Sequence, residues 1–328
     1  MNSPFGVLEF LHWNHSWNNF KYPSREELER VIDLMKEAGV GWVRMDFLWQ
    51  DIEPEQGKFD FGKYDQIVSL LNSKRINILG LLHYSAPWAS SCGEWNCPPQ
   101  NNELFVKYTS EVVSRYKDKV KYWEIWNEPD SAIYWKNQDG LKSYTLLLRD
   151  VYLALKKIDP ECKILNGGLA NGIAGVNHLY DNGAKDYFDI LNLHIFESPF
   201  NPGADKRIAS YPKLAYKIMS RNGDSHKKVW ITEIGCPGVK RWSKVKPWWL
   251  GRNPNLSEQA KWLKEVYSQL LRLPYTEKVF WAFFRDCKEH WKNGIDYFGL
   301  ITWDYSRKPS FTAFKECVED WRSKGELK

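Results

Sequence analysis

Two glutamates stand where apolar, aromatic-rich runs of the chain come to an end. Glu128 closes the run that starts at Tyr122 and is followed by Pro129, and Glu233 lies at the end of the run 229–234, just before Gly235. A carboxylate at the end of a buried strand is costly unless a site uses it. Two such carboxylates that meet over one substrate are the machinery of glycoside hydrolysis. The pair therefore predicts this chemistry, provided that the fold brings the two residues together.

The elements that must position these residues form a repeating pattern of strand, loop and amphipathic helix. The expected strands are Phe5–His12, Trp42–Trp49, Asn77–Tyr84, Tyr122–Asn127, Lys163–Leu169, Phe188–Phe196, Lys228–Ile234 and Val279–Phe284. Helices are expected after the N-cap signal at Ser24 up to Gly39, and near 62–74, 101–117, 141–157, 209–221, 257–271 and 309–323, with a short, weak helix near 177–183.

Eight strands alternating with helices indicate a parallel sheet, and closed into a ring they form a (β/α)8 TIM barrel. The main alternative is an open doubly wound sheet, which often has a glycine-rich phosphate loop after its first strand. Here that strand is followed by His12-Trp13-Asn14-His15, which cannot cradle a phosphate. We therefore expect an α/β barrel with long βα loops, a single catalytic domain spanning residues 1–328. The longest irregular insert, 236–256, is either a lid or a solvated basic loop.

Functional side chains in such barrels gather where the strands end. Strands four and seven lie across the ring from each other, so Glu128 and Glu233 are expected to flank one bond. The polar and aromatic residues at the expected strand ends are His12, Trp13, Arg44, Asp46, Trp49, His83, Asn127, Glu128, Asn166, His194, Glu233, Trp281, Arg285 and Asp286.

Three stretches carry a resemblance to known enzymes. Asn127-Glu128-Pro129, with a second Glu ending strand seven, resembles clan A of the glycoside hydrolases, the 4/7 barrel superfamily. The stretch Trp49–Asp60 is similar to the W-x-x-x-E-P-x-x-G-x-F segment of β-xylosidase-like and exopolysaccharide-cleaving members. Phe298–Ile301 with Lys308–Phe311 is similar to the passage that closes these barrels. Family 39 is the nearest match and family 5 the second.

The resemblance implies a retaining β-glycosidase or endo-glycanase with Glu128 as acid/base and Glu233 as nucleophile. It also implies that Arg44 lies beside the nucleophile, where a cation favours the ionised carboxylate. Asn127 is placed to donate a hydrogen bond to a sugar 2-hydroxyl. Many relatives carry a Tyr near the end of strand six, where this chain has Phe196. In those relatives the tyrosine donates a hydrogen bond to the nucleophile. Here that hydrogen bond falls to His194, to another residue such as Tyr297, or to none.

Three further candidates for substrate binding, His83, His194 and Trp281, each have a structural alternative. His83 and His194 either bind hydroxyls or orient a glutamate, or they are packed histidines at the barrel end. Trp281 is expected to form the floor under the cleaved sugar, with a core tryptophan as the alternative. The expected binding set is completed by four residues: His12, Trp13, Trp88 and Asp286.

Three further glutamates are assigned to structure or solvent. Glu124 lies four residues before Glu128, so alternation along a strand places both on one side. Its deeper position predicts a structural partner of an arginine. Glu53 and Glu55 lie in a loop and are expected to be solvated.

Composition narrows the choice of substrate class. The net charge is +5, with Lys and Arg spread among Asp and Glu, which disfavours nucleic acid as a partner. Tryptophan is abundant, at 18 residues, and many lie in loops rich in Gly, Pro and Asn. Flat aromatic faces suit sugar rings, so we expect an oligo- or polysaccharide substrate. The alternative is that these residues pack on the barrel rim.

The sequence carries no sign of a membrane segment or a cofactor. No apolar run approaches the ~18 residues of a membrane span, and no secretory signal precedes the first strand. The chain is therefore expected to be cytoplasmic or a processed secreted form. Cys92 and Cys97 lie close enough to form a disulfide, and no Cys or His spacing suggests a metal site. No cofactor is expected, and the sequence does not indicate an oligomeric state.

Two other functions compete with glycoside hydrolysis. One is a non-catalytic carbohydrate-binding barrel, against which the intact glutamate pair argues. The other is a metal-dependent barrel hydrolase, which would need a His-x-His or carboxylate cluster on the strands. The sugar, the linkage and the choice between exo and endo action are not determined.

Overall fold

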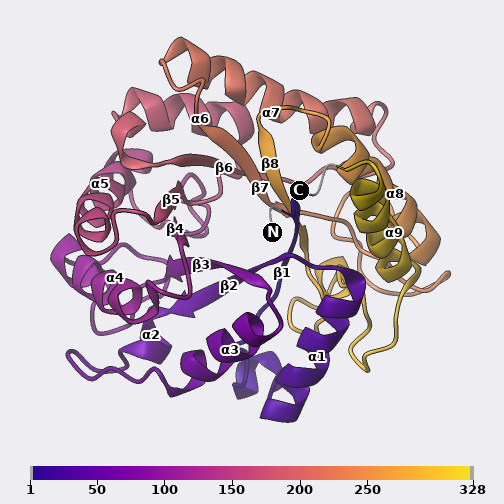
Figure 1. Ribbon diagram of the computed structural model, residues 1–328, viewed down its shortest axis with the longest axis horizontal. Coiled ribbons are helices and arrows are strands. Elements are labelled where there is room, and N and C mark those ends of the chain that lie inside the picture. Colours follow the sequence, from indigo (N-terminus) through magenta and orange to yellow (C-terminus); the bar gives the residue numbers. More distant parts are fainter. Residues whose placement is uncertain (1–2, 326–328) are drawn as a thin grey trace.

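The computed structural model describes residues 3–325, and its strands close into a parallel barrel in the order of the sequence (Figure 1). The strands are β1 (Phe5–Leu8), β2 (Trp42–Leu48), β3 (Asn77–His83), β4 (Tyr122–Ile125), β5 (Lys163–Asn166), β6 (Ile190–Ile195), β7 (Lys228–Ile234) and β8 (Thr276–Ala282). Pairing of β1 with β8 closes the ring. The expected (β/α)8 barrel is confirmed, and the open doubly wound sheet is excluded.

The helices surround the barrel (Figure 1). They are α1 (Arg25–Ala38), α2 (Trp49–Ile52), α3 (Gly62–Ser73), α4 (Asn102–Tyr116), α5 (Leu141–Ile158), α6 (Gly172–Asp181), α7 (Ala204–Arg221), α8 (Leu256–Leu270) and α9 (Pro309–Ser323). Ser24 caps α1 by accepting from the Glu27 N–H, and Gly39 ends it with a φ of 82°. Both signals were expected from the sequence. The single turn α2 and the start of α7 at Ala204 were not expected.

Large apolar side chains fill the lower interior of the barrel. One cluster is contributed by six residues of β2, β3, β5, β6, β7 and β8: Trp42, Leu79, Leu165, Ile190, Trp230 and Phe280. Such interior layers make the barrel a packed core rather than a pore. The larger core cluster lies between strands and helices. Burial on both faces explains why the strands read as continuous apolar runs.

Several strands end earlier than the sequence predicts, and β4 shows why this matters for function. β4 ends at Ile125, whereas the apolar run continues to Asn127. Trp126 and Glu128 have positive φ angles of 68° and 45°. Left-handed backbone is uncommon for residues other than glycine and clusters at functional sites. The chain therefore leaves the sheet at Trp126 and turns Glu128 toward the barrel mouth.

None of the helices in residues 3–325 combines the length and apolarity needed to cross a lipid bilayer.

Candidate active site

Glu128 and Glu233 meet at the C-terminal end of the barrel. Glu128 follows β4, and Glu233 lies near the end of β7. One oxygen of each carboxylate and one ring nitrogen of His194 lie within 4.8 Å of one another. The glutamate side chains are 13% and 15% exposed, so a substrate can reach both. The facing oxygens are therefore close enough for both carboxylates to reach one bond.

Arg44 of β2 links Glu233 to the barrel interior. Its Nη1 donates to Glu233 at 2.6 Å, and its Nε and Nη2 donate to Glu124 at 2.6 and 2.9 Å. Nη2 also donates to Asn127 at 2.8 Å. Glu124 is fully buried and accepts from the Gly168 N–H at 3.0 Å as well. The prediction that Glu124 is the structural partner of an arginine is confirmed, and the guanidinium is held in place for Glu233.

His194 of β6 contacts the other carboxylate. Its Nδ1 lies 2.8 Å from Glu128, and its Nε2 lies 3.0 Å from the Thr232 hydroxyl. Thr232 donates to Asn192 at 2.7 Å, so its oxygen is left to accept from His194. Nε2 therefore carries a proton, and Nδ1 shares a second proton with Glu128. The imidazole is fully buried, which keeps this proton away from bulk water.

The titration of this group follows from burial and close charges. Burial raises the pKa of Glu233, opposed by His194 and Arg44 and reinforced by the Glu128 carboxylate. Burial alone would lower the pKa of His194, but Glu233 and Glu128 raise it above its ordinary value. The charges of Glu233 and His194 thus depend on each other, with Arg44 as a permanent neighbouring cation.

Two other expected binding residues, His12 and His83, contact Asp46 of β2. Nε2 of His12 lies 3.7 Å and Nε2 of His83 lies 3.3 Å from the Asp46 carboxylate. Both rings are nearly fully buried. Burial lowers the pKa of His12 to about 4, although Asp46 opposes this. The two histidines lie around a shared carboxylate, and Nδ1 of each ring is buried without a hydrogen-bond partner among the described residues. A role for either residue in binding sugar hydroxyls therefore stays a prediction.

Burial affects two of the residues expected to bind sugar, Trp281 and Asp286. Trp281 is fully buried and donates its indole N–H to the Phe298 carbonyl at 2.9 Å, so it is a core residue and not the floor of a sugar site. Asp286 is ion-paired with buried Lys308 at 2.7 Å and is itself buried, so this ion pair accounts for its carboxylate and a role in binding sugar stays a prediction. Burial raises the pKa of Asp286 to about 6.

Glu53 is 1% exposed, so the expectation that it is solvated is wrong. Its carboxylate accepts from the Trp49 indole at 2.7 Å and from the Gly57 N–H at 2.7 Å. The tryptophan, glutamate and glycine of the 49–60 segment therefore form a structural clamp after β2. Glu55, in contrast, has a side chain that is 69% exposed, as expected.

Trp13 and Trp88 are tied into the rim of the barrel. Trp13 is 5% exposed, and its ring stacks on Phe10 at 4.0 Å. Trp88 is half-buried and donates its indole N–H to the Glu53 carbonyl at 2.9 Å. Rim packing thus accounts for these contacts, and a role for either residue in binding sugar stays a prediction.

Sequence reasoning missed two tyrosines beside the glutamate pair. The Tyr84 hydroxyl accepts from the Asn127 side-chain amide at 3.2 Å. Burial raises the pKa of Tyr134, and the charges of Glu128 and Glu233 raise it further. Tyr84 directly follows the expected strand-end residue His83, and Tyr134 lies six residues after Glu128 in an irregular loop. The first could have been found from its position, whereas no pattern marks the second.

The Glu128, His194 and Glu233 atoms are close enough to hold a metal ion. The guanidinium of Arg44 lies 2.6 Å from Glu233, and this neighbouring positive charge disfavours a second cation there. The absence of a metal therefore stays a prediction. Cys92 and Cys97 form a disulfide, so they are not available as thiolate ligands.

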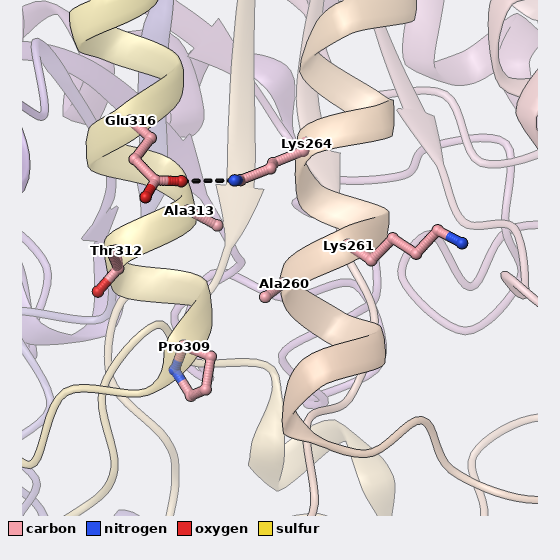
Figure 2. A pocket seen from close by; sticks show the side chains of 7 residues that line it. All are labelled: Ala260, Lys261, Lys264, Pro309, Thr312, Ala313 and Glu316. Atoms are coloured by element: carbon pink, nitrogen blue, oxygen red, sulfur yellow. Dashed lines mark ion pairs between the residues drawn. The ribbon is translucent and has the colours of Figure 1, made fainter.

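A cavity of about 580 Å³ lies far from this chemistry, between α8 and α9 on the outside of the barrel (Figure 2). Small residues such as Ala260 and Ala313 leave the space, and the Lys264–Glu316 ion pair of 2.5 Å spans the two helices. Nothing in this lining matches the paired acids at the barrel mouth.

Comparisons with known proteins give matches to glycoside hydrolases. A glycoside hydrolase family 42 model, described as beta-galactosidase, matches residues 17–81. The beta-galactosidase BgaH of Haloferax lucentense is 51% identical over 49 residues, which is 15% of this chain and 7% of that protein. Endo-1,4-beta-xylanase A of Humicola insolens is 27% identical over 156 residues, 44% of this chain and 39% of that protein. The chain thus spans less than half the length of these relatives.

Solved structures match over nearly the whole chain. A family 39 glycoside hydrolase from Bacteroides cellulosilyticus WH2 has a TM-score of 0.74 at 22% identity, covering 96% of this chain and 63% of that one. A GH5_18 enzyme from Streptomyces cattleya has a TM-score of 0.71 at 17% identity, covering 98% and 81%. The homologues and structural neighbours are glycoside hydrolases, so the chain resembles clan A, as expected, and it shares its fold with enzymes of families 39 and 5.

Proposed function

We propose that this protein is a retaining β-glycoside hydrolase that acts on an oligo- or polysaccharide. Glu128 is its acid/base and Glu233 its nucleophile. The observation that carries this proposal is the convergence of both carboxylates, with an oxygen of each within 4.8 Å of the other, at the mouth of a barrel. The similarity to glycoside hydrolases supports the reaction class.

In the first step Glu233 attacks the anomeric carbon while Glu128 protonates the departing oxygen. This forms a glycosyl-enzyme ester and releases the leaving group as an alcohol. In the second step Glu128 removes a proton from water, and the resulting hydroxide equivalent displaces Glu233 from the anomeric carbon. Both carboxyl groups return to their starting protonation, and the anomeric configuration is retained.

The neighbouring residues supply what each carboxyl group needs. Arg44 favours the ionised form of Glu233 against the effect of burial and orients it through the 2.6 Å hydrogen bond. His194 shares a proton with Glu128 at 2.8 Å, which provides Glu128 with the proton that it delivers in the first step. Asn127, held by Arg44 and Tyr84, presents its amide beside the acid/base and is placed to bind the sugar 2-hydroxyl.

The test uses two variants and an activated aryl β-glycoside panel. Glu233→Ala should abolish turnover, and azide should restore it as an α-glycosyl azide because a small anion can fill the place of the nucleophile. Glu128→Ala with azide should instead give the β-glycosyl azide. Full activity of Glu233→Ala would refute the proposal.

A non-catalytic carbohydrate-binding barrel is the second candidate, favoured by the exposed tryptophans of the loops, Trp17, Trp95 and Trp242. Binding of oligosaccharides to the wild-type protein without turnover of any glycoside in the panel would establish it instead.

A further inference from the structure

Three aromatic rings cluster beside Glu128 at the rim of the barrel. Trp95 lies on the loop after β3, Tyr84 directly follows β3, and Tyr134 lies on the segment after β4. The rings of Tyr84 and Trp95 are 4.6 Å apart, edge to face, and Tyr134 lies 6.2 Å from each of them. Trp95 is 44% exposed and the two tyrosines are half-buried, so the cluster presents aromatic surface to the solvent.

This cluster is physically continuous with the acid/base residue. The Ser131 N–H donates to the Glu128 carbonyl, and the Tyr134 N–H donates to the Ser131 carbonyl, each at 3.0 Å. A short turn thus runs from Glu128 to Tyr134. On the other side, Tyr84 accepts from Asn127, the residue before Glu128. Tyr84 and Tyr134 therefore lie near Glu128, whose charge acts on both hydroxyl groups.

The position of Trp95 is fixed by several restraints on its loop. The Cys92–Cys97 disulfide closes the loop around it, and its own carbonyl accepts from the Ser85 N–H at 3.0 Å. The next residue, Asn96, donates to the Ile133 carbonyl at 2.8 Å and accepts from the Lys136 N–H at 2.9 Å.

An exposed indole could by itself be incidental, because single exposed apolar residues are common. Here, however, the loop that carries it is restrained against the segment that carries Tyr134. Preorganised aromatic surface of this kind is suited to ligand binding, because little side-chain entropy is lost when the ligand binds.

We infer that Trp95, Tyr84 and Tyr134 form a binding platform for the sugar ring on the leaving-group side of the scissile bond. The inference rests on the proposed function, because the acid/base protonates the leaving oxygen and so marks that side. The apolar face of a pyranose stacks on the exposed indole. Trp95 is thus a residue that positions the leaving sugar and does not take part in the chemistry.

The test compares substrates that differ only in the leaving group. The probes are β-xylosyl fluoride with xylobiose and β-glucosyl fluoride with cellobiose, using the pair that the wild-type protein hydrolyses. Fluoride leaves the platform empty, whereas each disaccharide occupies it. Trp95→Ala should lower kcat/KM for the disaccharide about tenfold, the effect of losing one aromatic stacking contact, with kcat/KM for the fluoride unchanged.

Matched variants separate stacking from structural damage. Trp95→Phe should restore most of the disaccharide activity, because the flat ring is kept. Ile133→Ala, a change at a 67% exposed apolar residue of the adjoining segment, should affect neither substrate. Cys92→Ser with Cys97→Ser should lower disaccharide turnover alone, because the loop that holds Trp95 is released.

Each other outcome overturns the inference. Equal loss on both substrates would make Trp95 a structural residue, and no loss on either would leave the platform without a role. Where neither pair is hydrolysed, calorimetry measures the binding of the disaccharides to Glu233→Gln and to Glu233→Gln/Trp95→Ala. Equal affinities, or no binding to either variant, overturn the inference. Failure of the proposed function is distinct, since Glu233→Ala would then retain full turnover of the fluoride.

Discussion

Glu124 holds the arginine on which the proposed nucleophile depends, and its removal should destabilise the barrel. The side chain is fully buried and accepts two hydrogen bonds from Arg44, at 2.6 and 2.9 Å, and one from the Gly168 N–H at 3.0 Å. In Glu124→Ala the buried guanidinium keeps Glu233 as its only carboxylate partner at hydrogen-bond distance among the described residues. Breaking a buried ion pair by removing one partner costs about 3–5 kcal/mol, and we expect that loss in the free energy of unfolding.

The chain offers a matched control on its surface. Arg115 donates to Asp65 through Nε at 2.8 Å and Nη2 at 2.5 Å, the same paired geometry. These side chains are 45% and 40% exposed, so water screens the pair. Exposed ion pairs contribute about 0–1 kcal/mol, and Asp65→Ala should cost no more than about 1 kcal/mol plus a small loss at Tyr116.

Urea unfolding of the wild-type protein and both variants, followed by fluorescence and circular dichroism, measures the two costs. The double variant Arg44→Met/Glu124→Met should recover much of the loss, because no buried charge is left unpaired inside that pair. Its activity should still be low, since Glu233 has lost its cation. Glu124→Ala and Asp65→Ala of equal stability would refute the argument that burial makes the Arg44–Glu124 pair important.

Three further outcomes follow from the site. Because burial raises the pKa of Glu233, the acidic limb of kcat/KM should lie above pH 4.5, the ordinary pKa of a glutamate. His194→Asn should move this limb to higher pH, because it removes a charge that lowers the pKa of Glu233. A pH–rate profile with the limb at or below pH 4.5 contradicts this. The pKa of His194 is raised in the folded protein, so its charge stabilises the fold fully below pH 6.5, and this contribution is lost as pH rises through the raised pKa. The thermal stabilities of the wild-type protein and His194→Asn should therefore differ most in acid. A difference that does not depend on pH would exclude this contribution of His194. Since the Arg44 guanidinium already lies against Glu233, EDTA should leave turnover of an aryl glycoside unchanged, and a loss that zinc or magnesium reverses would point to a metal enzyme.

The fold could be predicted from the sequence because each strand and helix has a recognisable local sequence pattern. The strands are buried on both faces and read as apolar runs, and the helices carry caps and apolar stripes, so the strand order of a closed barrel followed from their alternation. The same regularity placed Glu128 and Glu233 at strand ends on opposite sides of the ring. It also identified Glu124 as the partner of an arginine, because alternation along β4 points it inward.

The depth of each side chain at the barrel mouth was decided only by the tertiary structure. Trp281 and Asp286 stand at strand-end positions as Glu233 does, yet both are buried, because the loop after β8 and the residue Lys308 close over them. Glu53 lies in an irregular segment, yet it is buried under the Trp49 indole. Burial depends on which distant loops pack on a residue, and local sequence does not encode that.

The sequence alone therefore determined the barrel fold and the position of Glu128 and Glu233 at the ends of their strands, since both depend on periodicity and on residue type within single elements. The tertiary structure decided the hydrogen bond between His194 and Glu128, the hydrogen bond from Arg44 to Glu233 and the position of Trp95 beside Tyr134. Each of these contacts joins residues from different strands or loops. Their distances result from how eight strands close into one ring and how the loops above it pack, and no segment fixes them by itself.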